Sequence, residues 1–173
     1  MLFVGIDPGK QGALAALDTD ALRRPALFSM PLMDTKVGLK AGGFRQCIDV
    51  YELNALFRAW DKDNENMHVV VEELWGFGTF ASGLPQQGQW NFARDYGAIQ
   101  ASLIALQIPH TMVAPQVWQK SVQKTGGKEG SIIRALSLFP ESQPDLRVSA
   151  KSYHDGKAEA LLLAWHGFKE IKR

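Results

Sequence analysis

Apolar residues are grouped along this chain in two ways. Short continuous runs are typical of buried strands, and longer segments with apolar positions three or four residues apart are typical of helices. The first two runs flank a Pro-Gly turn at residues 8–9 and predict a β-hairpin. The expected strands are residues 2–7, 12–17, 25–30, 67–74 and 110–115. The expected helices are residues 50–63, 90–107, 116–123, 129–139 and 152–168.

This order of elements predicts an α/β fold. A hairpin followed by alternating helices and strands produces a mixed five-stranded sheet with helices on both faces. Residues 31–49 have no clear period, so we expect an irregular segment there. The sequence shows no repeat, low-complexity tract or linker, and we expect residues 1–173 to form one domain.

Composition narrows the class of protein. Forty-six per cent of the 173 residues are hydrophobic, but no run is long enough to span a membrane. The single cysteine, Cys47, excludes an internal disulfide and fits a reducing compartment, so we expect a cytoplasmic protein. The net charge of +1 does not by itself indicate a nucleic-acid partner. Basic residues nevertheless gather in residues 115–134, which permits a basic face.

Acidic residues stand at three informative places. Asp7 ends the first apolar strand, and Glu72 and Glu73 come at the end of the next long one. Both strands should be central, so their carboxylates would lie together at one edge of the sheet. Asp155 and Glu159 are four residues apart and share one face of the closing helix. A buried carboxylate cluster needs compensating cations, and the absence of a Cys/His cluster favours Mg²⁺ or Mn²⁺ over zinc.

Each acid also has an ordinary interpretation. Asp7 could form an Asx turn before Pro8, and Glu72 could be a solvated acid at a strand end. Asp155 could stabilise a helix N-terminus that Ser152 opens. A one-residue change of register would exchange Glu72 with Glu73.

Four motifs in order resemble the RuvC-type Holliday junction resolvases of the RNase H-like superfamily. Their details resemble the phage and mitochondrial branches more than the cellular bacterial enzymes, and we expect a phage-like member. "GIDPGKQGALAAL" resembles the opening hairpin, and "VVVEELWGF" resembles the second acidic strand. "NFARDYGAIQASLIALQIPHTMVAPQVWQKSV" resembles the helix, strand and Pro-Trp-Lys segment that follow. "HDGKAEALLLA" resembles the last helix, which carries two acids in the family.

The resemblance implies a Mg²⁺-dependent endonuclease of DNA recombination and repair. Such an enzyme nicks opposed strands of four-way branched DNA, using two metal ions for phosphodiester hydrolysis, and Mn²⁺ is expected to substitute. The family pattern assigns Asp7, Glu72, Asp155 and Glu159 as catalytic metal ligands. Glu159 departs from the usual Asp at its position and reaches one methylene further.

The resemblance also implies DNA contacts and a partner subunit. Lys120 and Lys128 lie where the family carries basic residues near the scissile phosphate. Trp75, Phe77 and Phe80 occupy a Gly-rich loop and are candidates for wedging into a junction. Because a four-way junction is nearly two-fold symmetric, we expect a homodimer. The expected interface is the 90–107 helix, through its apolar residues Phe92, Ile99, Leu103 and Leu106. The compartment implied is the cytoplasm of a phage-infected or bacterial cell.

Three other functions share parts of this pattern. Another RNase H-like nuclease, acting on flaps, forks or RNA–DNA hybrids, would use the same acids. A non-catalytic junction-binding protein would follow if the Glu159 change disabled the site. Actin-like sugar kinases and ATPases share the Asp-x-Gly hairpin, but they need two such lobes and this chain holds one.

Overall fold

A mixed five-stranded sheet forms the centre of the computed structural model, which describes residues 1–20, 24–36, 44–63, 67–73, 86–150 and 152–171. The strand order is β3-β2-β1-β6-β7. β1 pairs with β2 and β2 with β3 in antiparallel fashion, whereas β1–β6 and β6–β7 are parallel. The strands are β1 (Leu2–Asp7), β2 (Ala13–Asp18), β3 (Ala26–Ser29), β6 (Met67–Glu72) and β7 (His110–Val113). The predicted fold class is confirmed.

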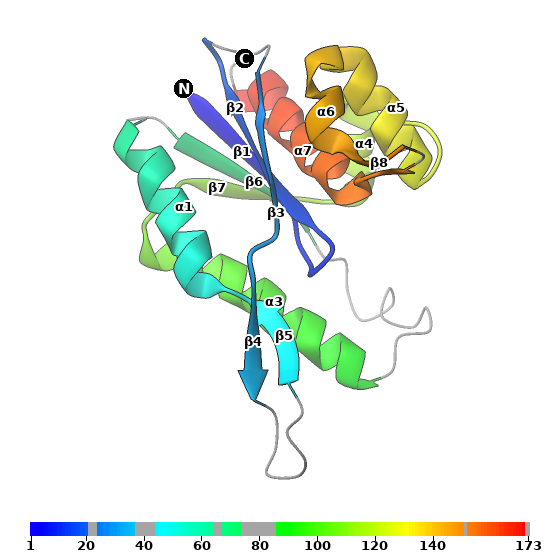
Figure 1. Ribbon diagram of the computed structural model, residues 1–173. Helices are drawn as coiled ribbons and strands as arrows, with labels where there is room; N and C mark the ends of the chain where they lie inside the picture. Colours follow the sequence, from blue (N-terminus) through cyan, green and yellow to red (C-terminus); the bar gives the residue numbers. More distant parts are fainter. Residues whose placement is uncertain (21–23, 37–43, 64–66, 74–85, 151, 172–173) are drawn as a thin grey trace.

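Helices cover both faces of this sheet, as predicted (Figure 1). One face packs on α1 (Val50–Asp63) and α3 (Gln86–Ala105). The other packs on α4 (Pro115–Ser121), α5 (Lys128–Leu138) and α7 (Asp155–Ile171). Side chains of β1 alternate between the two cores, so Val4 and Ile6 face α1 and α3 while Phe3 faces α7. Asp7, two residues beyond Gly5, therefore ends on the α7 side.

Small residues let α7 lie very close to β1. A Cβ atom built on Gly5 would overlap the carbonyl oxygen of Ala160 and the backbone nitrogen of Ala164. Further along the helix, a Cβ on Gly167 would press against Val70 and Phe3. The close approach is a packing requirement on the sequence, and it sets where the acidic start of α7 meets the sheet.

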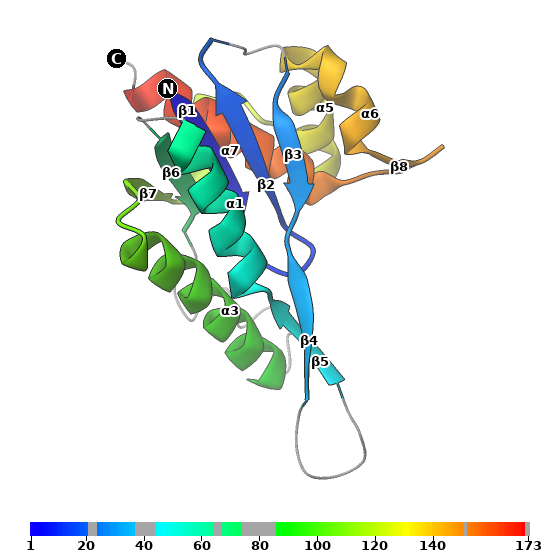
Figure 2. The ribbon, with the colours of Figure 1, turned by 60° about the vertical axis from the view of Figure 1, so that its left-hand side comes forward.

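Two stretches within residues 31–49, namely 32–36 and 44–48, form an antiparallel ribbon, so the expectation of an irregular segment is wrong for the part that the structure describes. β4 (Leu32–Lys36) pairs with β5 (Phe44–Ile48), and Thr35 lies opposite Arg45. Met30 and Ile48 at its base are buried in the core beside α1 and α3. Figures 1 and 2 show the ribbon projecting away from the central sheet. Its pairing depends on tertiary anchoring, because an isolated two-stranded ribbon is marginally stable.

Smaller elements connect α5 to α7. They are η1 (Pro140–Ser142), α6 (Gln143–Leu146), β8 (Arg147–Ser149) and β9 (Ser152–Tyr153). Because Ser152 and Tyr153 pair with the preceding strand, α7 begins at Asp155 and not at the expected residue 152. Within the described ranges, no helix has the length and apolar character required to cross a membrane.

Replacing Gly5 should disrupt the contact between β1 and α7. The obstacles to a Cβ there are backbone atoms that cannot rotate away, so Gly5→Ala should lower the free energy of unfolding by at least about 2 kcal/mol. Urea unfolding followed by circular dichroism measures this change. Asp61→Asn, at an exposed position on α1, is the control and should leave the free energy of unfolding unchanged. An equal loss in both variants would contradict the packing argument.

Candidate active site

The four predicted acids line one cleft of about 600 Å³ at the carboxyl ends of β1 and β6. Asp7 comes from β1 and Glu72 from β6, while Asp155 and Glu159 come from the first turns of α7. The opposite wall belongs to α3, which contributes Asn91, Phe92 and Asp95. Carboxylates far apart in the sequence are thus brought to one edge of the sheet, where α/β folds place their ligands.

The start of α7 is held against the turn between β1 and β2. A Cβ on Gly156 would lie 2.6 Å from the carbonyl oxygen of Gln11 and 2.9 Å from Oδ2 of Asp7. Both values are shorter than real Cβ contacts, so this position requires glycine. The backbone N–H of His154 donates to the carbonyl of Leu146, and its Nδ1 accepts from the backbone of Lys157. These bonds give His154 a part in forming the helix start beside Asp155.

The structure distinguishes Glu72 from its neighbour Glu73. Oε1 of Glu72 accepts a hydrogen bond of 2.9 Å from the indole Nε1 of Trp118, and Glu72 lines the cleft. Glu73 is exposed and does not line the cleft. Burial raises the pKa of Glu72, the Trp118 hydrogen bond opposes that rise, and the Glu159 charge adds to it. The indole of Trp118 therefore stabilises the ionised form of Glu72, which burial and the nearby Glu159 charge destabilise.

Glu159 is held by two side chains, one from α5 and one from the segment that joins α4 to α5. Ser131, at the start of α5, donates a 2.8 Å hydrogen bond to Oε1 of Glu159. Nζ of Lys124 lies 3.5 Å from the same oxygen and 5.6 Å from the centre of the Trp118 ring. The Lys124 side chain is only 5% exposed. This buried lysine consequently serves as a fixed positive charge between two acids of the cleft.

Lys124 reaches this place because α4 ends in a left-handed residue. Gln123 has φ of 58°, and the N–H groups of Gln123 and Lys124 bond back to the carbonyls of Lys120 and Gln119. This arrangement is a common way of ending a helix, but it usually has glycine at the left-handed position. The sequence prediction missed Lys124 as a site residue since no glycine marks the turn that directs it inward.

Asp155 forms an ion pair with Lys128 at the mouth of the cleft. Burial opposes ionisation of Asp155, but the hydrogen bond and charge of Lys128 outweigh it and lower the pKa of Asp155. The same hydrogen bond raises the pKa of Lys128. The Lys128 side chain is 76% exposed, unlike that of Lys124. Solvent screens this pair, so it can separate at little cost when another anion or cation competes.

Asp7 is the most perturbed acid of the cleft. Burial raises the pKa of Asp7 to about 8, and the charges of Glu159, Glu72 and Asp155 contribute to that rise. Lys128 opposes the shift only in part. A carboxyl buried among three other carboxyls is unfavourable in its ionised form unless a further positive charge lies beside it.

Oxygen donors of this kind fit a hard divalent cation such as Mg²⁺ or Mn²⁺. Within the described parts of the chain, no three acidic, histidine or cysteine side chains converge closely enough to form a complete metal site. Three of the four carboxylates are engaged by protein donors, namely Trp118, Ser131 with Lys124, and Lys128. The four carboxylates therefore have the chemistry that a divalent cation requires. In this structure, three of them are oriented by hydrogen bonds and ion pairs to protein groups.

The remaining predicted residues are distributed differently. Lys128 lines the cleft, whereas Lys120 is exposed on α4 and does not. Trp75, Phe77 and Phe80 lie outside the described residues. Asn91 and Asp95 on the α3 wall were not predicted, because helical spacing alone does not show which polar residues face a cleft. Asp95 is 3% exposed and pairs with its neighbour Arg94 at 2.7 Å.

Comparison with solved structures identifies the fold. The RuvC of Thermus thermophilus in complex with a Holliday junction substrate aligns over 99% of this chain and 96% of its own, with a TM-score of 0.57 and 14% identity. The fold of this chain is that of RuvC. A second T. thermophilus RuvC structure covers the same shares of both chains at a TM-score of 0.55 and 14% identity. The yeast mitochondrial Holliday junction resolvase Ydc2 aligns over 95% of this chain and 76% of its own, at a TM-score of 0.52 and 14% identity. No protein-family model and no curated protein sequence matches the chain.

The raised pKa of Asp7 makes stability depend on pH. Between about 4 and 8 the folded chain keeps a proton that the unfolded chain releases, so the free energy of unfolding falls as pH rises through this window. Asp7→Asn removes the titrating group. In metal-free buffer its melting temperature should exceed that of the wild type by several degrees at pH 8.5 and by less at pH 5.

Thermal unfolding followed by circular dichroism measures this difference. Asp61→Asn, at an exposed position on α1, is the control and should leave the melting temperature unchanged. Addition of Mg²⁺ should stabilise the wild type more than Asp7→Asn, because bound ligand stabilises the folded state. A pH-independent difference between Asp7→Asn and wild type would contradict the burial argument.

Proposed function

We propose that this chain is a Holliday junction resolvase, a metal-dependent endonuclease that nicks four-way branched DNA in recombination and repair. The observation that carries the proposal is the gathering of Asp7, Glu72, Asp155 and Glu159 in one cleft of a RuvC fold. The solved neighbours named as Holliday junction resolvase and as RuvC with a junction substrate support the choice of branched DNA. The free thiol of Cys47 fits a reducing cytoplasm, such as that of a phage host.

The four carboxylates would hold the two Mg²⁺ ions that the proposal requires, with Mn²⁺ as a substitute. When bound, such ions supply an activated water and stabilise the leaving 3′-oxygen of the cut strand. Trp118 would keep Glu72 ionised and correctly oriented for this task. Lys124 and Ser131 would fix the longer Glu159 side chain, which explains how a glutamate can serve where the family pattern has aspartate.

Lys128 has the properties of a residue that changes partner when DNA arrives. It is exposed, flexible and paired with Asp155 through a solvent-screened contact. A phosphate entering the cleft would compete for its ammonium group, and that exchange would release Asp155 toward the metal. Lys120 lies outside the cleft, so its proposed contact would be with a more distant part of the DNA backbone.

A homodimer would supply the second active site that symmetric cutting needs. The four apolar residues predicted for the interface are directed elsewhere: Ile99 and Leu103 are fully buried, Leu106 packs on the same core, and Phe92 lines the cleft. A different stripe of α3 is exposed, with Trp90 and Ile104 each 67% exposed at its ends. The small residues between them, Ala93, Gly97 and Ala101, would allow close approach of a second α3.

Another RNase H-like nuclease remains the second candidate. The same four acids would cut a flap, a fork or an RNA–DNA hybrid by the same chemistry. The observation behind this alternative is the composition of the cleft, because its acidic residues would act on a phosphodiester of any of these substrates. The substrate must therefore be decided by a direct comparison.

Cleavage of a labelled synthetic four-way junction in Mg²⁺ tests the proposed function. The wild type should make paired nicks in opposed strands, and Asp7→Asn should cut at least 100-fold more slowly because the buried ligand set is broken. Linear duplex, three-way flap and RNA–DNA hybrid substrates are run in parallel, with Asp61→Asn as a control of full activity. If the hybrid or the flap is cut and the four-way junction is not, the resolvase proposal is wrong and the second candidate function is supported.

The mass of the protein in solution tests the α3 interface. Size-exclusion chromatography with light scattering should give twice the 19.2 kDa of one chain for the wild type. Ala101→Glu places a charge in the centre of the exposed stripe and should shift the mass to that of a monomer. Ile133→Glu, at a position 62% exposed on α5, should leave the dimer intact. A monomeric wild type, or a monomer from both variants, would contradict this interface.

A further inference from the structure

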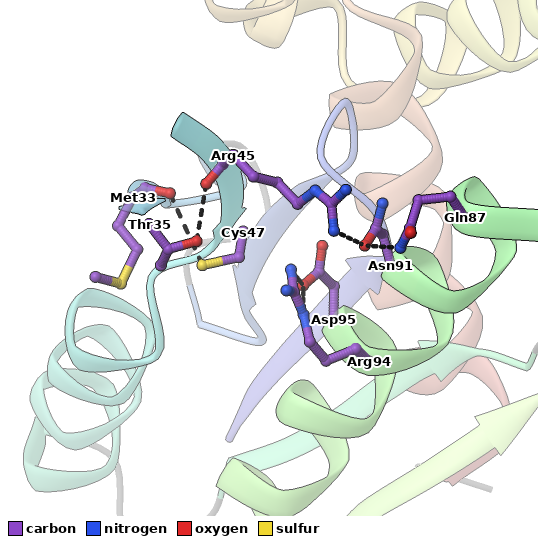
Figure 3. Close-up of polar contacts among 8 residues, drawn as sticks. All are labelled: Met33, Thr35, Arg45, Cys47, Gln87, Asn91, Arg94 and Asp95. Carbon is purple, nitrogen blue, oxygen red and sulfur yellow. Dashed lines mark hydrogen bonds and ion pairs between the residues drawn. The ribbon is translucent and has the colours of Figure 1, made fainter. Parts of the chain in front are cut away.

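We propose that Arg45 and Asn91 form a phosphate-binding subsite on the α3 wall of the cleft. Its ligand would be a DNA backbone phosphate that flanks the scissile one. The inference rests on the proposed function and extends it, since it gives the β4–β5 ribbon a direct part in holding the substrate. Figure 3 shows Arg45 reaching from the ribbon to Asn91 on α3.

Asn91 is oriented by its neighbours on both sides. Its Oδ1 accepts a 2.8 Å hydrogen bond from Nη1 of Arg45 and a 3.4 Å hydrogen bond from Nε2 of Gln87. Because the oxygen accepts both bonds, the amide nitrogen is presented as a donor. Asn91 also lines the cleft that holds the four acids. A fixed N–H donor on this wall suits the anionic oxygens of a phosphodiester.

Arg45 carries a positive charge that the described residues leave uncompensated. Its side chain bonds to the neutral amide of Asn91, and no ion pair joins it to a carboxylate in the described ranges. Three other basic side chains near the cleft differ. Arg94 pairs with Asp95, Lys124 with Glu159, and Lys128 with Asp155. The guanidinium of Arg45 uses one of its five N–H donors on Asn91, and its planar fork matches a phosphate.

The ribbon holds Arg45 in place for this contact. Thr35 Oγ1 donates a 3.0 Å hydrogen bond across the ribbon to the carbonyl of Arg45, its register partner. At the base, Ile48 is 3% exposed and packs in the core beside α3. An arginine is more than a mechanical anchor requires, because a neutral donor could make the same bond to Asn91 without placing an unpaired charge there. The charge is better explained by an anionic ligand.

A phosphate at this position would balance the charges of the cleft. The α7 side carries acids suited to cations. On the other side, Arg45 of β5 is bonded to Asn91, which lines the cleft, and Lys10 lines it from the turn between β1 and β2. A DNA strand that crosses the cleft would place one phosphate beside the metal-binding acids. The next phosphate would then lie beside the N–H donors of Arg45 and Asn91. The ribbon would then fix the register of the strand relative to the acids, and register determines which phosphodiester is cut.

Salt dependence of DNA binding tests the subsite without relying on cleavage. Full-length Asp7→Asn protein serves as the parent, and its affinity for a fluorescent four-way junction is measured by anisotropy between 50 and 200 mM salt, roughly the range over which such affinities change most. Adding Arg45→Gln should weaken binding about 3- to 10-fold and reduce the slope of log K against log salt by about 1. Arg45→Lys should retain the slope, while Asn91→Ala should weaken binding about 3-fold with the slope unchanged.

Arg58→Gln is the matched control, because Arg58 is exposed on α1 and, unlike Arg45, is bonded to no cleft-lining residue within the described ranges. Equal slopes for Arg45→Gln and Arg58→Gln would overturn the proposal. A lower melting temperature for Arg45→Gln with unchanged DNA affinity would show that Arg45 only anchors the ribbon. If the loss of DNA affinity in Arg45→Gln depends on the sequence of the junction but not on salt, Arg45 recognises bases. That result would also overturn the proposal. If the Asp7→Asn parent binds linear duplex with the same affinity as the junction, the proposed resolvase function is contradicted. The salt slopes measured on duplex would still test the phosphate subsite, because they report a phosphate contact on either DNA.

Discussion

The close packing of α7 on β1 is the constraint on which the rest of this structure depends. Gly5 lets the helix backbone approach the strand, and Gly156 lets its first turn rest on the turn between β1 and β2. With larger residues at these positions, the acids of α7 would lie further from Asp7. The chain thus accepts two glycines in regular elements, each of which weakens local structure, to bring four carboxylates into one cleft.

Gathering acids in a cleft creates an electrostatic problem that this protein meets partly with its own side chains. The segment from α4 to α5 supplies Trp118, Lys124, Ser131 and Lys128, each bonded to one of the acids. Lys124 is buried and stays in place, while Lys128 is exposed and can be displaced. Burial raises the pKa of Asp7, the charges of the other three acids raise it further, and Lys128 offsets this rise only in part. The side chains of the cleft are therefore oriented before ligands bind, but the charge of Asp7 is not fully compensated by protein groups.

Prediction from sequence succeeded where local pattern and burial agree. Continuous apolar runs identified β1, β2 and β6, and the acids at their ends were found because charged residues interrupt those runs. It failed for the β4–β5 ribbon, since two short strands of mixed polarity have no period that distinguishes them from loop. Trp118 is fully buried, and its indole N–H bonds to Glu72 from inside the core. Periodicity shows that a residue is buried and says nothing of what its polar atom contacts.

The sequence by itself determined the five strands of the central sheet, the helices that cover it and the α/β class. It also determined the four acids Asp7, Glu72, Asp155 and Glu159 as candidates for one site. These follow from local periodicity and from the cost of placing a carboxylate in an apolar run. Only the tertiary structure decided that Glu72 and not Glu73 enters the cleft, that Lys124 turns inward, and that Arg45 reaches α3. Each of these depends on contacts between segments far apart in the chain, where side-chain direction is set by packing and not by neighbours in sequence.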